Sequence, residues 1–231
     1  MTVTIHTNMS LHNQVQTASW LNCGLVRKGI DCVITPDKTA DGDIHIIQGP
    51  HYCYQDWIGK PDVLWLNRTF YGDSVFNISL GWLNADGSRD FYNKNMAEPK
   101  GELPELKEKK NSEHTAVVFA DYGRDMLSLV IYASHNWPQA YFRPHPAQHT
   151  TTELETLTGD LAAVWEKADI AVGHSSTVLV EAELNGLHVY SSDPNHVCQG
   201  ITDRRQWLTD LSWAQWNHTE LMNGDWIEHL L

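Results

Sequence analysis

A histidine and three hydroxyl residues follow directly after an apolar segment. Ile170–Gly173 predicts a buried strand that ends in glycine, and a helical pattern begins within a few residues. Unpaired backbone N–H groups at a helix N-terminus, joined by serine and threonine hydroxyls, bind phosphate groups. The alternative is a set of helix caps without a ligand, although a cap needs a single hydroxyl. The turn consists of His174, Ser175, Ser176 and Thr177.

A second segment with phosphate-binding chemistry is Arg143-Pro-His-Pro146, upstream of this turn. Prolines fix the backbone on both sides of His145, so the imidazole and the guanidinium lose little entropy on binding. Arg143 suits a bidentate contact with phosphate, and His145 can donate one hydrogen bond. The alternative is an ordinary proline-rich turn with a surface histidine. Together with the turn at 174–177, the segment favours a nucleotide that is held by its phosphates.

Glu181 lies about one turn into the helix that follows the hydroxyl residues. From that position its carboxylate either accepts hydrogen bonds from ribose hydroxyls or faces solvent. Both interpretations fit the sequence.

The acidic charge of the chain is concentrated in its second half. The net charge is −13; residues 1–110 hold 11 basic and 13 acidic residues, whereas residues 111–231 hold 5 basic and 16 acidic ones. An anionic ligand bound there needs a local exception to the negative field. Surface salt bridges are the alternative role for the arginines at 204 and 205. The cations of the second half are Arg124, Arg143, Lys167, Arg204 and Arg205.

The order of apolar and turn segments predicts two α/β domains that face a cleft, followed by a helical tail. Residues 1–95 predict strands at 3–7, 31–35, 43–48, 62–66 and 75–82 and a helix over 13–28. Residues 113–205 predict strands at 115–120, 140–142, 169–173 and 188–191 and helices over 126–135, 152–167 and 176–184. The tail, residues 206–231, is expected to consist of helices over 205–216 and 220–231. Residues 96–112 predict a linker, in which a solvated helix is favoured over a nucleic-acid patch for Lys107–Lys110.

Composition excludes several classes of protein. Hydrophobic residues make up 42% and charged residues 19% of the chain, which is typical of a globular protein. The four cysteines form no Cys-x-x-Cys pair and the histidines do not fall at ligand spacings, so we expect no metal site. No long apolar run or secretory signal is present, which predicts a cytoplasmic protein without a membrane segment. The sequence leaves the oligomeric state open.

As an ordered set, these motifs resemble the donor half of GT-B glycosyltransferases. The resemblance is strongest to the branch that includes capsule-polysaccharide, Kdo and bacterial sialyltransferases. The matching segments are Asp121–Arg124, Arg143–Pro146, Ala168–Ala182 and Asn185–Tyr190. Other segments are similar to small glycosyltransferase-like proteins of bacteriophages. These are Gln48–His51, Leu66–Asp73, Gly81–Trp82 and Asp203–Trp207.

The resemblance implies a GT-B fold, a nucleotide-sugar donor linked to UDP or CMP, and no metal or other cofactor. It implies that the His-Pro motif and the hydroxyl-rich turn contact the nucleotide phosphate and that Glu181 holds the ribose. The expected donor-binding residues are Gly123, Arg124, Arg143, His145, His174, Ser175, Ser176, Thr177 and Glu181.

Sugar transfer by direct displacement needs a base for the acceptor hydroxyl and stabilisation of the departing phosphate. The candidates for the base are Asp73, His51 and Asp121, and a single base favours inversion of configuration. The phage resemblance favours duplex DNA with a hydroxylated or hydroxymethylated pyrimidine as acceptor, although the acidity of the chain opposes DNA binding. The alternatives are a glycan or capsule-type acceptor, or a nucleotide-sugar-binding module without catalysis.

Overall fold

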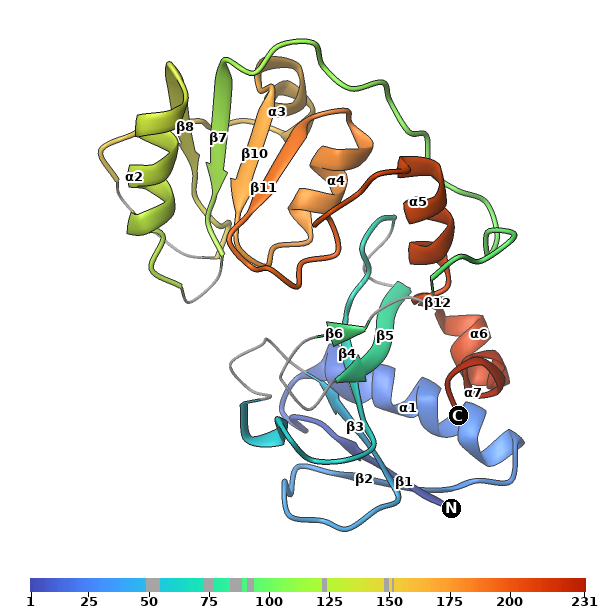
Figure 1. Ribbon diagram of the computed structural model, residues 1–231. Coiled ribbons are helices and arrows are strands. Elements are labelled where there is room, and N and C mark those ends of the chain that lie inside the picture. The colour runs from blue at the N-terminus through green and yellow to red at the C-terminus, as the bar shows by residue number, and fades with distance from the viewer. Residues whose placement is uncertain are drawn as a thin grey trace. The chain divides into compact units, whose positions relative to one another are not determined.

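The computed structural model describes residues 1–48, 55–72, 77–83, 89–90, 94–121, 124–147, 150 and 152–231. The chain forms two compact units (Figure 1). The first unit contains residues 1–103 together with 206–231, and the second contains residues 104–205. The C-terminal residues therefore belong to the same unit as the N-terminus. No helix among the described residues is both long and apolar enough to cross a membrane.

The first unit is built on a mixed sheet with the strand order β12-β5-β4-β3-β1-β2. Its parallel strands are β1 (Thr2–His6), β2 (Asp31–Thr35), β3 (Ile44–Gln48) and β4 (Val63–Arg68). Its antiparallel strands are β5 (Asn77–Leu83), β6 (Arg89–Asp90) and β12 (Gln215–Asn217). The strand β12 comes from the C-terminal part of the chain, so this open sheet is complete only when residues 215–217 have joined it.

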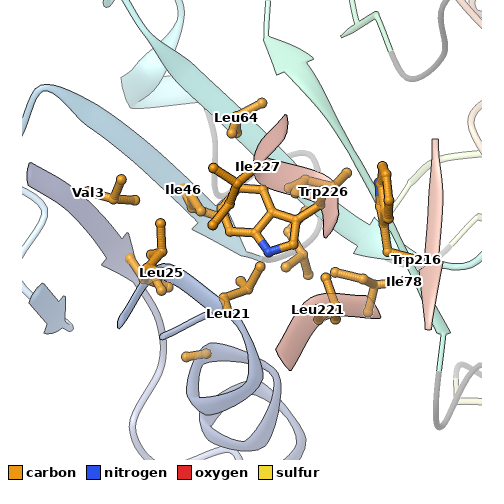
Figure 2. Packing of buried hydrophobic residues seen from close by; sticks show 14 residues of the cluster. Val3, Leu21, Leu25, Ile46, Leu64, Ile78, Trp216, Leu221, Trp226 and Ile227 are labelled. Atoms are coloured by element: carbon orange, nitrogen blue, oxygen red, sulfur yellow. The ribbon is translucent and has the colours of Figure 1, made fainter. Parts of the chain in front are cut away.

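The hydrophobic core of the first unit lies where helices cover one face of the sheet (Figure 2). Val3 and Ile5 point to this face because successive strand residues alternate, and both are fully buried. Leu21 and Leu25, one helical turn apart on α1 (His12–Arg27), pack against them. Leu221 of α6 (His218–Asn223) and Trp226 of α7 (Asp225–Leu230) complete the core. The opposite face carries the short helix η2 (Gln55–Trp57).

The second unit is a parallel sheet with the strand order β11-β10-β7-β8-β9. Its strands are β7 (Thr115–Phe119), β8 (Gln139–Arg143), β9 (Glu155–Thr156), β10 (Ile170–Gly173) and β11 (His188–Ser191). Its helices are α2 (Leu127–Asn136), α3 (Leu161–Lys167) and α4 (Val178–Leu184), and α5 (Arg204–Ser212) begins at its end. Val118 and Val172 face α2, whereas Gly173 contacts Leu179 of α4 on the other face. The sheet is therefore covered on both sides (Figure 1).

Two of the predicted helices are wrong in part. Residues 152–160 are not helical, because β9 pairs with β8 in this stretch. The helix α3 begins at Leu161, and Asp160 caps it by accepting a hydrogen bond from the N–H of Ala163. The helix expected over 205–216 ends at Ser212, because the chain turns there and enters the first sheet as β12. That strand buries Trp216 beside Ile78. The first error arises from pairing with a strand 14 residues upstream, and the second from pairing with β5, more than 130 residues away.

The alternative of a solvated helix at Lys107–Lys110, within the predicted linker, is wrong, because this segment runs extended along the second unit. The N–H of Lys107 donates to the carbonyl of Leu184, and the N–H of Lys110 donates to that of Gly186. A side chain at Gly186 would meet the carbonyl oxygen of Glu108 at 2.1 Å, and the φ of Gly186 is +81°. Glycine at this position thus allows the close approach of the two backbones.

Candidate active site

The carboxyl ends of the parallel strands in the second unit meet at one edge of the sheet. From β7 the chain moves outward to β8 and β9, then returns to the other side of β7 as β10 and continues to β11. The gap between the ends of β7 and β10 is the topological switch point, which is the usual ligand position in open α/β sheets. Asp121 follows β7 and Ser175 follows β10, so both lie at this point.

Asp121 and Ser175 are joined directly. The backbone N–H of Ser175 donates to Oδ2 of Asp121 at 2.6 Å, and the Ser175 hydroxyl donates to the same oxygen at 3.0 Å. The residue Asp121 is only 5% exposed. Its other carboxylate oxygen, Oδ1, is buried and accepts no hydrogen bond from any described residue. The carboxylate is therefore held by one oxygen, and its second oxygen has no partner among the described residues.

Arg124 brings a positive charge to the same loop. Its backbone N–H donates to the carbonyl of Asp121 at 3.3 Å, and its Nε is buried without a hydrogen-bond partner among the described residues. Gly123, expected to bind the donor, lies outside the described residues, as does Tyr122. The structure thus places Asp121 and Arg124 together after β7.

The hydroxyl-rich turn at 174–177 leaves several of its backbone donors unused. Thr177 is the N-cap residue of α4, and its side chain accepts no capping hydrogen bond. Within the described part of the chain, the backbone N–H groups of Ser176, Thr177 and Val178 donate to no partner. The interpretation of the hydroxyls as helix caps is therefore not realised at Thr177, and this turn presents N–H groups suited to an anion.

Besides Asp121, the end of β11 and the loop after it also form hydrogen bonds with the turn at 174–177. The Ser191 hydroxyl donates to the carbonyl of His174, and the imidazole Nδ1 of His174 lies 2.8 Å from the Ser192 hydroxyl. Nε2 of His196 lies 3.2 Å from the carbonyl oxygen of Ser176. Ser191, Ser192 and His196 were not among the residues predicted from the sequence. The available signal was Ser191-Ser-Asp-Pro194, a polar stretch at another strand end on the same edge.

Arg143 and His145 lie at the end of β8, next to β7. The guanidinium of Arg143 donates to the carbonyls of Leu157 at 3.2 Å and Gly159 at 2.7 Å, which fixes the chain before α3. Nδ1 of His145 accepts a hydrogen bond from the N–H of Ala147 at 3.1 Å. In a neutral imidazole this acceptance places the proton on Nε2, so His145 is a donor there.

Glu181 lies on the first turn of α4, half-buried. Burial raises the pKa of this carboxyl because the charged form loses solvation. Its neighbour Glu183 is in a different environment: it is buried and forms ion pairs with Lys109 at 2.7 Å and Arg204 at 2.7 Å. The two carboxylates of α4 therefore differ in their partners. Glu183 is paired with Lys109 near the start of the second unit and with Arg204 near its end.

Two of the three expected bases, His51 and Asp73, lie outside the described residues. The first unit does contain a histidine pair that the sequence analysis missed. Nε2 of His6 lies 3.0 Å from Nδ1 of His45, and the ring of Trp57 covers both imidazoles. Burial lowers the pKa of His6, and it likewise lowers that of His45. No periodic pattern links the two histidines, which meet through the register of β1 and β3. Among the described residues, no group of three histidine, cysteine or acidic side chains could hold a metal ion.

Comparisons with known proteins give a structural likeness but no relative by sequence. No protein-family model matches the chain, and no curated protein matches it. Among solved structures, the chain is similar to Thermosulfurimonas dismutans KpsC, described as a β-Kdo 2,7 transferase, with a TM-score of 0.55 and 11% identity over 99% of each chain. A second structure, the KpsC β-Kdo 2,4 transferase of the same organism, matches with a TM-score of 0.49 and 12% identity over 96% of this chain and 97% of its own.

The first of these likenesses extends over the full length of both chains and so concerns both units. The fold is α/β with two parallel-rich sheets in two Rossmann-like units, of the GT-B type. The fold class predicted from the sequence is confirmed. The resemblance to bacteriophage proteins stays a prediction.

Proposed function

We propose that the protein is a glycosyltransferase that moves a sugar from a nucleotide-linked donor to a hydroxyl group of a glycan. The observation that carries this proposal is the switch point of the second sheet. There, the unused N–H groups of Ser176, Thr177 and Val178 lie in the turn that Asp121 holds through Ser175. Phosphate-binding amides beside a buried carboxylate are the two parts that displacement at a sugar carbon requires.

The donor phosphate binds the N–H groups and hydroxyls of the turn at 174–177. His145 donates a hydrogen bond through Nε2, and Arg124 supplies positive charge from the loop after β7. Arg143 contributes mainly through its charge, because two of its N–H groups are already bonded to the carbonyls of Leu157 and Gly159. These groups replace a metal ion in stabilising the departing phosphate.

In the chemical step, an acceptor oxygen attacks the anomeric carbon while the bond from that carbon to the phosphate oxygen breaks. The acceptor's proton passes to a carboxylate or imidazole base, and the bonding electrons leave with the nucleotide. Asp121 is the candidate base among the described residues, because it lies at the switch point and its Oδ1 accepts no hydrogen bond from any of them. His51 and Asp73 remain candidates on the acceptor side. One base suffices for inversion of configuration.

Glu181 is proposed to accept hydrogen bonds from the ribose of the donor. Its half-buried carboxyl lies one helical turn from the hydroxyl-rich turn. A nucleotide ribose that donates to this carboxylate would compensate for the solvation it has lost.

A glycan is the acceptor that the comparisons favour. A solved structure that resembles this chain over its full length is described as a transferase of Kdo, which is itself a sugar. The DNA acceptor expected from the sequence has no support from the comparisons, and the net charge of −13 opposes it. It stays a prediction that the same assay can test.

The test is a panel of UDP- and CMP-linked sugars, assayed for binding and for release of the free nucleotide. Binding raises the unfolding temperature in proportion to the ratio of ligand concentration to Kd. Mass spectrometry of added oligosaccharides and of hydroxymethylated DNA then identifies the acceptor. Binding without nucleotide release or product from any donor would contradict catalysis and support a binding module.

The variant Asp121→Asn tests the chemical role within this assay. Asparagine keeps an oxygen that can accept from the Ser175 N–H but cannot take up the acceptor's proton. We expect kcat to fall by about 10²- to 10⁴-fold with little change in nucleotide affinity. The matched control is Asp125→Asn, an exposed aspartate four residues further on, which should leave kcat unchanged. An Asp121→Asn enzyme with wild-type kcat would remove Asp121 from the mechanism.

A further inference from the structure

Side chains from the end of β11 and from the loop after it bind carbonyl oxygens of the hydroxyl-rich turn. The Ser191 hydroxyl donates to the carbonyl of His174, and Nε2 of His196 lies within hydrogen-bond distance, 3.2 Å, of the carbonyl of Ser176. Neither side chain is in the motifs by which the sequence suggested a phosphate site. Both act on the backbone of that site.

These carbonyls decide where the amides of the turn point. A trans peptide unit is planar, so its C=O and the N–H of the next residue point in opposite directions. The peptide between His174 and Ser175 is held at both ends: Ser191 bonds its carbonyl and Asp121 accepts from its N–H. The peptide between Ser176 and Thr177 is held at its carbonyl end by His196 and by the N–H of Leu179. Its N–H, on Thr177, therefore points away from His196, and it has no partner among the described residues.

The loop that supplies His196 is itself rigid. Nδ1 of His196 accepts from the N–H of Cys198 at 3.2 Å, which leaves Nε2 of the neutral ring as the donor to Ser176. The amide of the Gln199 side chain donates to the carbonyl of Ser191 at 2.7 Å. The N–H of Asp193 donates to the hydroxyl of Ser191 at 3.0 Å. His196 and Ser191 are buried, so their positions are fixed before any ligand arrives.

We propose that Ser191 and His196 are positioning residues for the donor phosphate, which they never touch. His196 orients the N–H of Thr177, which binds the phosphate. Ser191 fixes the preceding peptide, whose N–H on Ser175 is bonded to Asp121, and so holds the start of the turn in place. This inference rests on the proposed function. Preorganised amides bind an anion without a further cost of ordering. Loss of the Ser191 or the His196 side chain therefore weakens phosphate binding specifically.

The experiment compares a nucleoside monophosphate with its parent nucleoside, using CMP with cytidine or UMP with uridine, whichever pair the wild type binds. The variants are His196→Ala and Ser191→Ala. Their matched controls are His135→Ala and Ser134→Ala on the exposed last turn of α2. We expect each test variant to raise the Kd of the monophosphate about five- to tenfold, the effect of one hydrogen bond. The Kd of the nucleoside should stay within about twofold, and both controls should match the wild type.

A merely structural role gives a different result, because a loosened unit would weaken nucleoside and nucleotide equally. Such parallel loss, or an unchanged monophosphate Kd, would overturn the proposal. In turnover, the test variants should raise the donor KM more than they lower kcat. If His196→Ala fails to fold, His196→Gln decides the question, since its side-chain amide can replace Nε2 as the donor to Ser176. A folded His196→Gln protein should bind the monophosphate like the wild type, and a tenfold loss there would contradict the inference.

The outcome also separates this inference from the function on which it rests. A wild-type protein that binds no nucleotide under any condition of the panel would overturn both. A wild-type protein that binds the monophosphate, with variants that keep the full difference between monophosphate and nucleoside, would overturn the positioning role alone.

Discussion

At the scale of single residues, Asp121 determines how much of the hydroxyl-rich turn is available to a ligand. It already occupies the N–H and the hydroxyl of Ser175. A phosphate in the same turn therefore has the N–H groups of Ser176, Thr177 and Val178 as its backbone donors. The carboxylate and a bound phosphate thus use different amides of one turn. The positive charge of Arg124 lies in the loop after β7, together with Asp121. In the proposed reaction this arrangement brings charges of both signs close to the bond between sugar and phosphate.

Glu181 shows the cost of placing an acidic group at such a site. Its pKa is raised by burial, so its ionisation favours the unfolded state. A group with a raised folded pKa contributes its full stability below the unfolded value, 4.5, and loses that contribution as the pH rises through the folded value. At neutral pH the ionised Glu181 therefore lowers the free energy of unfolding in the absence of ligand.

We predict that Glu181→Gln raises the unfolding temperature of the ligand-free protein at pH 7 to 8 and weakens donor binding. The gain in stability should disappear near pH 4, where the wild-type carboxyl is also neutral. Calorimetry at both pH values, together with nucleotide titration, checks the two parts. Glu166→Gln on α3 is the exposed control and should change neither quantity. A Glu181→Gln protein that is less stable at pH 8 would contradict the role of burial.

At the scale of elements, local patterns located most strands and the first helix of each unit. The apolar segments at 115–120 and 169–173 became β7 and β10, because buried parallel strands are continuous apolar runs. The pattern failed where a distant strand decided the outcome. Residues 155–156 extend along β8, and residues 215–217 along β5, although 155–156 lie inside one predicted helix and 215–216 inside another.

The residues that the structure brings together at the candidate site were predictable to the same degree. Asp121 and the turn at 174–177 were identified because glycine, hydroxyl and acidic residues at strand ends form visible motifs. Ser191 and His196 were not, since they act on backbone carbonyls, and any polar side chain at a strand end looks alike in sequence. The pair of His6 and His45 needs the register between β1 and β3, which no local pattern contains.

The contact between α1 and α6 gives a prediction at this scale. A Cβ on Gly24 of α1 would lie 2.2 Å from the carbonyl oxygen of Leu221 and 3.0 Å from the backbone of Gly224. These are backbone atoms, so α6 must shift to admit a methyl group. We predict that Gly24→Ala lowers the free energy of unfolding by about 1–3 kcal/mol despite the higher helix propensity of alanine.

Urea denaturation measures this change. Gln16→Ala, at an exposed position of α1, is the control, and it should be neutral or slightly stabilising. A Gly24→Ala protein as stable as the wild type would mean that α6 does not pack against α1 as closely as the structure shows.

At the scale of the whole molecule, the chain leaves the first unit near residue 103 and returns to it near residue 206. The returning segment supplies β12, α6, α7 and most of α5. Leu221 and Trp226 are fully buried and Trp216 is 2% exposed, all three in the core of the first unit (Figure 2). The N-terminal part of the chain therefore lacks a complete core until residues 206–231 have been synthesised.

We predict that a chain that ends at residue 205 keeps the second unit folded but loses the first. Removal of Trp216, Leu221 and Trp226 exposes the core face of α1 and β1, whereas the second unit lies within residues 104–205 and keeps its sheet. Hydrogen exchange mapped by mass spectrometry should show loss of protection in peptides from 1–48 and retained protection in β7 and β10. A chain that lacks only the exposed Leu231 is the control and should exchange like the wild type. Protected amides in β1 and α1 of the shortened chain would show that the first unit does not depend on its C-terminal segment.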